Sequence, residues 1–334
     1  MPTRRSVLFS TAAAASMPTA LFSQAANKWA PAMDLARSYD QMHTLVISQA
    51  GQIRLGEVLR GPSLERAVNV KSVSKTVVAA LMGAAIDRDE VLGVDATLGQ
   101  IVPDLIPASA DPRVADITLA DLVTMQAGLE RTSGANYGDW VSSPNWVAYA
   151  LSRPMIREPG EGMLYSTGSF HILGVALARA TGRSLLSQAR QRLGNPLGIR
   201  ISAWAQDPQG NYLGGNEMAL SPLSMIRFGE MYRLGGIWQD QQVLSNTWVE
   251  TSFVPRTRSF FSGLAYGYGW FLGRTQGHNF ALARGYGGQL ICILPDLELT
   301  IAITSDPTRP ARSAGYFGAL MRLIGDIVPI AKTT

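Results

Sequence analysis

Residues 71–88 read KSVSKTVVAALMGAAIDR, which is a serine and lysine pair followed by a strongly apolar run. The run predicts a helix from about Ser72 to Arg88. Its apolar residues fall on nearly every side, so we expect the helix to be buried. Ser72 and Lys75 are three residues apart and therefore share one helix face, where their side chains can hydrogen-bond.

This pair has the chemistry of a nucleophile and its base. A serine hydroxyl becomes nucleophilic when a neighbouring base takes its proton. A lysine in an apolar environment has a lowered pKa, which makes its neutral amine available as that base. A helix start also offers free backbone N–H groups to a developing oxyanion. On the tetrapeptide alone, a capping serine with a surface lysine is the more common interpretation, so the rest of the chain has to decide.

The flanking sequence predicts strands at both ends of the chain and helices between them. We expect strands at 43–48, 53–59, 267–272, 280–284, 289–294 and 297–304. The expected helices cover 119–127, with Thr118 as its cap, and 170–180, 184–193, 222–234 and 314–327. The pattern indicates an α+β fold in which an antiparallel sheet flanked by helices carries an inserted helical subdomain. We assign residues 33–95 and 260–334 to the sheet domain and residues 96–259 to the helical subdomain.

Two further motifs follow the serine and lysine pair. Tyr165 lies in the Gly-bounded loop 159–168, just before a predicted helix, and could present its phenol to a cleft beside the Lys75 ammonium. Residues 284–289, Arg-Gly-Tyr-Gly-Gly-Gln, precede an apolar strand, and the N–H of Gln289 could serve as an oxyanion donor. Taken singly, a tyrosine packed on its helix and a glycine-rich strand end remain alternatives.

Together these motifs resemble the serine β-lactamase, DD-peptidase and esterase superfamily, and most closely its class C branch. The resemblance rests on Ser72–Lys75, on residues 117–129 and 159–168, on Asn195-Pro196-Leu197-Gly198-Ile199 and on residues 286–296, in this order along nearly the whole chain. It implies the β-lactamase/transpeptidase-like fold, with the site between the sheet and the helical subdomain.

The resemblance also implies residue roles. Ser72 would be acylated, and Lys75 and Tyr165 would share the proton transfers. The N–H groups of Ser72 and Gln289 would form the oxyanion hole. Further oxyanion or substrate contacts are expected from Tyr286, Gly288 and Thr167, and from Trp140 in a loop beside the cleft, where buried anchoring is equally compatible with the sequence.

The chain departs from the β-lactamases and peptidases of this superfamily at two points. Thr167 stands where they usually carry asparagine, and Tyr286-Gly287-Gly288 stands where they carry Lys-Thr-Gly. This is closer to the esterases and nylon-oligomer hydrolases, although Arg284 could replace the missing cation. We therefore expect a serine hydrolase of a small carboxylic ester or amide. DD-peptidase or β-lactamase activity, or a non-hydrolytic periplasmic penicillin-binding or sensor protein, are the alternatives.

Composition limits the remaining possibilities. Nearly half of the residues are apolar, and the small positive charge shows no basic run, so a nucleic-acid partner is not expected. The single cysteine, Cys292, excludes an internal disulfide and lies in an apolar segment. Three scattered histidines give no metal-ligand pattern, so neither a metal nor a cofactor is expected. The sequence does not indicate an oligomeric state.

The N-terminus has the pattern of an export signal. Arg4 and Arg5 precede an Ala-rich apolar stretch that ends in small residues near Ala25. This predicts a removable twin-arginine-type signal peptide at residues 1–25 and a periplasmic location. No later segment is long and apolar enough to predict a membrane span.

Overall fold

The computed structural model describes residues 28–333, so the predicted signal peptide lies outside the described residues. Its main sheet has eight strands in the order β2-β1-β12-β11-β10-β9-β8-β7. All the strand pairs are antiparallel, and β1 lies beside β12, so the two ends of the described chain meet within one sheet. The strands are β1 (Met42–Gln49), β2 (Gln52–Val58), β7 (Thr257–Arg258), β8 (Ala265–Tyr266), β9 (Phe271–Thr275), β10 (His278–Gly285), β11 (Gln289–Leu294) and β12 (Leu299–Ser305).

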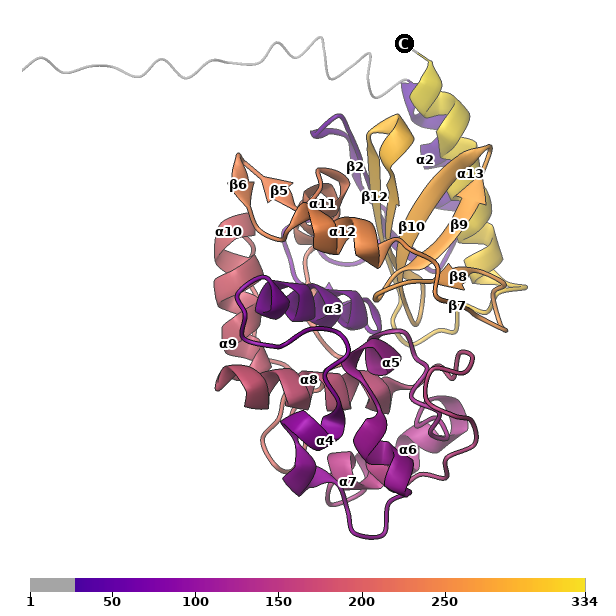
Figure 1. Ribbon diagram of the computed structural model, residues 1–334. Helices are drawn as coiled ribbons and strands as arrows, with labels where there is room; N and C mark the ends of the chain where they lie inside the picture. The colour runs from indigo at the N-terminus through magenta and orange to yellow at the C-terminus, as the bar shows by residue number, and fades with distance from the viewer. Residues whose placement is uncertain (1–27, 334) are drawn as a thin grey trace, which may run out of the picture.

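Helices cover this sheet on both faces (Figure 1). Helices α2 (Ala30–Ser38) and α13 (Tyr316–Lys332) pack against each other on one face. Helix α11 (Pro222–Arg233) packs on β1, β11 and β12. The contact of α11 is close at Gly229, where an added Cβ would lie 2.6 Å from Thr300 Cγ2 and 2.9 Å from Ile291 Cγ2. Burial of the β11 and β12 side chains beneath these layers forms the core of the sheet part.

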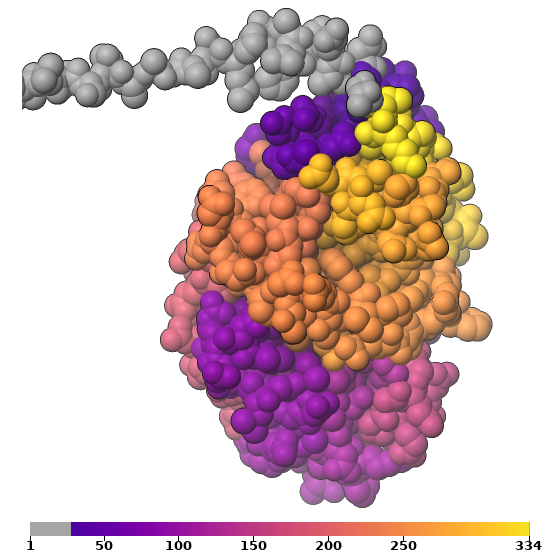
Figure 2. All heavy atoms as spheres, turned by 45° about the horizontal axis from the view of Figure 1, so that its top comes forward, coloured from indigo at the N-terminus to yellow at the C-terminus, as the bar shows by residue number. Residues whose placement is uncertain are grey.

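The remaining helices pack below the sheet part, as Figure 2 shows in purple and magenta under the orange segments. Helix α8 (Thr167–Thr181) contacts α3, α4, α5, α7 and α9 and is therefore the centre of this half. The other helices of this half are α4 (Leu98–Ile101), α5 (Leu119–Val123), α6 (Tyr137–Val141), α7 (Trp146–Leu151), α9 (Leu185–Ala189) and α10 (Asn195–Leu197). Helix α12 (Asn246–Ser252) lies above α3, with the orange segments of the sheet part (Figure 1). Outside the main sheet, β3 (Val68–Asn69) pairs with β4 (Ala219–Leu220), and β5 (Ile237–Trp238) pairs with β6 (Gln241–Gln242).

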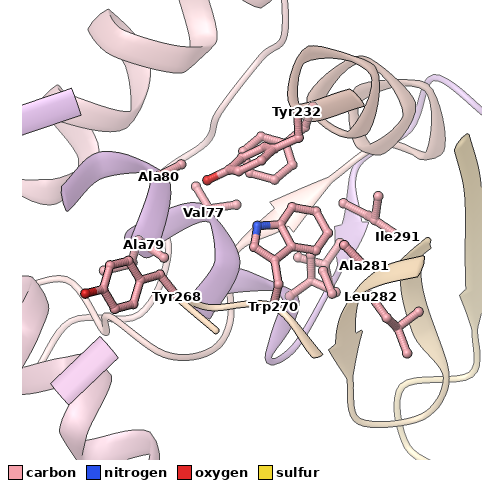
Figure 3. Close-up of a cluster of buried hydrophobic side chains, with 14 of the residues drawn as sticks. Val77, Ala79, Ala80, Tyr232, Tyr268, Trp270, Ala281, Leu282 and Ile291 are labelled. Carbon is pink, nitrogen blue, oxygen red and sulfur yellow. The ribbon is translucent and has the colours of Figure 1, made fainter. Parts of the chain in front are cut away.

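Helix α3 (Val73–Ile86) lies between the two halves and contacts both α8 and β10. Every residue from Val73 to Ala85 is buried, which follows from the apolar character of the helix on all sides. Figure 3 shows Val77, Ala79 and Ala80 of this helix beside Tyr268 and Trp270. The small alanines allow this approach, because an added Cβ at Gly269 would lie 2.6 Å from Ala79 Cβ.

The predicted α+β class with an antiparallel sheet is confirmed, and several element boundaries differ from the prediction. The capping box at Thr118 starts α5 as expected, but the helix ends at Val123 because Met125 adopts a left-handed conformation with φ of 65°. Residues 267–270, predicted as strand, form a turn with Gly269 at φ of 79°, so β9 begins only at Phe271. Residues 190–194 form a π-helical turn after α9 in place of the continuous helix predicted.

The predicted boundaries of the two subdomains stay a prediction. Helix α11 belongs by position to the segment 96–259 that we assigned to the helical subdomain, yet it packs on the sheet. Among residues 28–333, no helix combines the length and the apolar character that crossing a membrane requires.

The contact between the Gly269 turn and α3 can be tested by adding one methyl group. Gly269→Ala should lower the free energy of unfolding by about 1–3 kcal/mol, because the methyl group overpacks the contact and the backbone must remain left-handed. Gly51→Ala is the matched control, since Gly51 has φ of 76° and no atom within 4 Å of an added Cβ. Equal losses for the two variants in urea denaturation would contradict tight packing at Gly269.

Candidate active site

A cavity of about 560 Å³ opens at the N-terminal end of α3, where the helical half meets the end of β10. It brings together the segments that the sequence singled out: the start of α3, the loop before α8 and the glycine-rich end of β10. Its side-chain lining includes Lys71, Ser72, Arg131, Ser133, Tyr137, Tyr165, Thr167, Asn216, Glu217, Phe261, Phe271, Arg284 and Tyr286.

Lys75 is buried beside Ser72. Its Nζ lies 3.0 Å from Ser72 Oγ, 2.6 Å from the carbonyl oxygen of Gly215 and 3.3 Å from Thr167 Oγ1. The residue is only 1% exposed, and none of these partners is a carboxylate. Burial therefore lowers the pKa of the Lys75 ammonium to about 7. A large fraction of this amine is neutral near pH 7 and can accept a proton from Ser72.

The carbonyl that binds Lys75 is positioned by two consecutive glycines. An added Cβ at Gly214 would lie 2.0 Å from the Phe170 carbonyl oxygen, and one at Gly215 would lie 3.0 Å from that of Thr167. Side chains at these positions would push the segment away from α8. Their absence lets the Gly215 carbonyl reach the Lys75 amine. The sequence analysis missed this pair, although Gly-Gly before Asn216 was the available signal.

Tyr165 lies beside the same pair of side chains. Its ring stacks on Phe271, with centroids 6.3 Å apart, and Lys75 Nζ lies 5.1 Å from the ring centroid. Burial raises the pKa of the Tyr165 phenol, while a hydrogen bond with the Ser72 side chain and the charge of Arg284 oppose that rise. The phenol is therefore protonated near pH 7. From the sequence, we expected the Lys75 ammonium to be the cation that stabilises the phenolate of Tyr165. In the structure, the Arg284 guanidinium also acts on the pKa of this phenol.

The residue before the serine is held in an uncommon conformation. Lys71 has φ of 51°, a left-handed value that non-glycine residues seldom adopt. Its N–H donates to Asn69 Oδ1 over 2.8 Å, and its Nζ donates to Glu217 Oε1 over 3.0 Å. Asn69 Nδ2 in turn donates to Glu217 Oε2. This network fixes the turn that presents Ser72, and the sequence analysis did not identify Asn69 or Glu217.

The end of β10 lies directly against that turn. An added Cβ at Gly285 would lie 2.3 Å from the Val70 carbonyl oxygen and 3.2 Å from Lys71 Cβ, so the close approach requires glycine. Tyr286 follows at the cavity wall, with its side chain 53% exposed. The backbone N–H groups of Ser72 and Tyr286 donate to no other backbone group within residues 28–333. Both groups are therefore free to face a bound molecule.

Gln289, predicted as the oxyanion donor, does not line the cavity. Gln289 is paired with Gly285 where β11 runs beside β10. Its buried side chain donates from Nε2 to the Ser305 carbonyl oxygen and accepts from the Ser305 N–H at Oε1. Gly288 also lies away from the cavity, where an added Cβ would meet Tyr316 at 2.7 Å. Of the residues that the sequence matched with Lys-Thr-Gly, Tyr286 lines the cavity and Gly287 and Gly288 do not, whereas the preceding residues Arg284 and Gly285 do.

The interpretation of Trp140 as a substrate contact is wrong for a similar reason. Trp140 is fully buried and donates from Nε1 to the Trp146 carbonyl oxygen over 2.9 Å. Both rings pack edge-on against His171, whose Nε2 lies 3.0 Å from Asp207 Oδ2. Trp140 of α6 and Trp146 of α7 thus anchor these two helices to α8. Thr167, by contrast, lines the cavity and is within hydrogen-bonding distance of Lys75.

Arg284 lines the sheet side of the cavity, and its charge acts on Tyr165. Its guanidinium stacks on Phe317 at 3.5 Å from the ring centroid and donates to the Ala311 carbonyl oxygen over 2.9 Å. Burial lowers its pKa to about 10, so it remains charged at neutral pH. It forms no ion pair with any carboxylate of residues 28–333. The positive charge of Arg284 is therefore available to a bound anion.

Among residues 28–333, no group of three or more His, Cys, Asp or Glu side chains is arranged so that it could hold a metal ion. Cys292 lies in β11 and is fully buried, which raises the pKa of its thiol.

Comparison with known proteins agrees with these motifs. A family model described as Beta-lactamase matches residues 60–325, a range that contains Ser72, Lys75, Tyr165 and Arg284. Among curated proteins, the D-alanyl-D-alanine-carboxypeptidase/endopeptidase AmpH of Escherichia coli K12 is 26% identical over 229 residues, or 64% of this chain. The chain spans only 58% of the length of that relative.

Solved structures share the fold at low sequence identity. A Bacillus anthracis protein assigned as a 6-aminohexanoate-dimer hydrolase has a TM-score of 0.75 at 17% identity, and the match covers 87% of this chain and 79% of the Bacillus chain. EstCE1, a hydrolase with promiscuous acyltransferase activity, has the same score and identity, covering 93% and 100%. A penicillin-binding protein homologue from Caulobacter crescentus has a TM-score of 0.71 at 14% identity, covering 91% and 98%.

The lowered pKa of Lys75 predicts how the reactivity of Ser72 depends on pH. Because the neutral amine activates the serine, the rate of Ser72 labelling by a fluorophosphonate should rise with pH through about 7. The raised pKa of Tyr165 predicts no decline below pH 10. Intact-protein mass is followed against time from pH 5.5 to 9.5, which checks both the predicted rise in labelling rate near pH 7 and the predicted lack of a decline at higher pH. A rate that keeps rising towards pH 10 would mean that Lys75 has an ordinary pKa.

Proposed function

The chain belongs to the beta-lactamase family, as its motifs indicated, and from this premise we propose that it is a serine hydrolase of a small carboxylic ester or amide. The observation that carries the proposal is the 3.0 Å contact between Lys75 Nζ and Ser72 Oγ, in a buried position without a carboxylate. A lysine in that environment supplies a neutral base at the pH where a hydrolase works.

In the acylation step, Ser72 Oγ attacks the substrate carbonyl carbon while Lys75 takes the hydroxyl proton. We assign the oxyanion hole to the N–H groups of Ser72 and Tyr286, in place of Gln289, because both residues line the cavity and neither group donates to another backbone group within residues 28–333. Collapse of the intermediate breaks the bond to the leaving group. Tyr165 donates the proton that the leaving group requires and is reprotonated from Lys75.

Deacylation reverses these roles with water as the nucleophile. Water loses a proton to the Lys75–Tyr165 pair and attacks the acyl carbon, and Ser72 leaves as the hydroxyl with a returned proton. The products are a carboxylic acid and the free enzyme. The same groups serve both half-reactions, so loss of either Ser72 or Lys75 should stop the cycle.

The charge of the cavity supports a substrate that carries a carboxylate. Lys71, Arg131 and Arg284 line it together with a single acid, Glu217, which already pairs with Lys71. Among residues 28–333, no carboxylate forms an ion pair with Arg284, whose charge acts on Tyr165. A guanidinium held in this way binds carboxylates strongly, because the hydrogen bonds are charge-assisted and partly desolvated.

Cleavage of a D-amino-acid peptide is a second candidate function. It is favoured by the likeness to AmpH, whose name describes carboxypeptidase and endopeptidase activities. The terminal carboxylate of such a peptide would also suit Arg284. The site lacks the lysine that β-lactamases carry in the third motif, which argues against efficient penicillin turnover.

The location of the protein rests on the sequence alone. We propose export to the periplasm, because residues 1–25 have the charged, apolar and small-residue parts of a twin-arginine-type signal.

Variants of the two central residues test the mechanism. Ser72→Ala should abolish ester hydrolysis, and Lys75→Met should lower kcat/KM by about 10²–10⁴-fold because the general base is lost. Steady-state hydrolysis of 4-nitrophenyl hexanoate, with circular dichroism to confirm folding, provides the measurement. Asp207→Asn, at a buried pair away from the cavity, is the control for general destabilisation. Near-normal turnover in Ser72→Ala would refute the proposed nucleophile.

The role of Arg284 is tested by a matched pair of esters. Mono(4-nitrophenyl) adipate carries a terminal carboxylate, whereas 4-nitrophenyl hexanoate has the same acyl length without charge. Arg284→Met should reduce the ratio of kcat/KM for adipate to that for hexanoate by about tenfold or more, because a charge-assisted contact is lost. An unchanged ratio would remove Arg284 from substrate recognition and leave the acyl-serine mechanism intact.

A further inference from the structure

A second cavity, of about 640 Å³, lies beside the edge strands β7 to β10. It is separate from the catalytic cavity, although residues of β9 and of the segment between β7 and β8 line both cavities. Phe271 lines the catalytic cavity and Leu272 lines the second one. Consecutive residues of a strand point to opposite faces of the sheet, so the side chains of Phe271 and Leu272 face the two cavities from opposite sides of β9.

The floor of this second cavity is apolar and built from small residues. Leu272 is paired with Ala265 of β8 and with Ala281 of β10, so the three side chains form a row across the strands. Leu272 and Ala281 are buried, Ala265 is half-buried, and the two alanine side chains extend less far from the sheet than the leucine does. Phe253 and Pro255, which follow α12, form a wall. The floor therefore suits an apolar group.

The rim carries two guanidinium groups without ion-pair partners. Arg274, two residues after Leu272 on the same strand face, donates to the Gly277 carbonyl oxygen, and Arg258 donates to that of Gly263. Neither forms an ion pair with a carboxylate of residues 28–333. Both side chains are exposed, so each can turn toward a ligand. The other polar rim residues are Asn279, which pairs with Arg274 across the strands, and Asp296.

Asp296 limits where an anionic head group can lie. Its carboxylate is 3.7 Å from His278 Nδ1, at the end of the cavity formed by the turn after β11. An anion is repelled from that end and attracted toward the two arginines. The lining as a whole carries one more positive than negative charge. Apolar floor and cationic rim together define an amphipathic site with a preferred orientation.

We propose that this cavity binds a small amphipathic anion, a carboxylate or sulfonate with an aliphatic or aromatic body. The body lies on Leu272, Ala265 and Ala281, and the head group accepts hydrogen bonds from Arg258 and Arg274. Charge-assisted bonds from guanidinium groups give the head its affinity, and burial of the apolar body adds to it. The site does not depend on the Ser72 chemistry, so it stands apart from the proposed function.

The fluorescent sulfonate 8-anilinonaphthalene-1-sulfonate serves as the probe, and decanoate serves as the competitor. With the full chain, the probe should bind saturably and be displaced by decanoate. The double substitution Arg258→Glu and Arg274→Glu should weaken both affinities by about tenfold or more, since two charge-assisted contacts become repulsive. Arg54→Glu is the matched control, because Arg54 is an exposed arginine on β2, outside both cavities.

A second variant changes the shape of the site without altering its charge. Ala265→Leu should also weaken binding, because the larger side chain takes up space in the cavity that Ala265 lines. Circular dichroism confirms that each variant is folded. The proposal is overturned if the probe does not bind, or if Arg54→Glu weakens binding as much as the double variant does. It is equally overturned if Arg284→Met, in the catalytic cavity, reduces probe binding while the double variant leaves it unchanged.

Discussion

Burial of Lys75 without a carboxylate partner is the constraint on which the rest of the site depends. An ammonium in an apolar environment is costly, so the group lowers its pKa and binds through neutral acceptors. The Gly215 carbonyl and the Ser72 and Thr167 hydroxyls provide those acceptors. The apolar surface of α3 excludes water around the amine, and this exclusion keeps a large fraction of the amine neutral near pH 7, so that it can accept the proton of Ser72.

Glycines set the distances between the segments that surround Lys75. Gly214 and Gly215 let one chain segment approach α8, and Gly285 lets β10 touch the turn before Ser72. The Lys71–Glu217 ion pair then holds that turn in its left-handed conformation. Rigid, close-packed contacts of this kind hold reacting groups within a narrow range of positions, which catalysis requires. The serine is thus presented by packing from both halves of the molecule.

Much of this arrangement could be predicted from the sequence, because it follows from local patterns. The all-round apolar run predicted a buried α3, and the order of the motifs predicted the fold and the meeting of Ser72, Lys75 and Tyr165. The Asn69–Glu217 contact spans 148 residues and has no local signal. The sequence did not show that Gly285 and Tyr286 line the cavity while Gly288 and Gln289 do not, because residue order does not show where β10 ends. The position of Trp140 was ambiguous for a similar reason, since the sequence around a tryptophan does not show whether its side chain is buried, as it is in α6, or exposed in a cleft.

The pKa of Lys75 is the quantity that tests the account most directly. The chain has only four lysines, Lys28, Lys71, Lys75 and Lys332, so labelling lysine with ¹³C at Cε gives a spectrum that can be assigned with single variants. We expect one resonance, absent from Lys75→Met, to titrate near pH 7, well below the ordinary lysine pKa of 10.5. Titration of the Lys75 resonance near pH 10 would contradict the neutral-amine base.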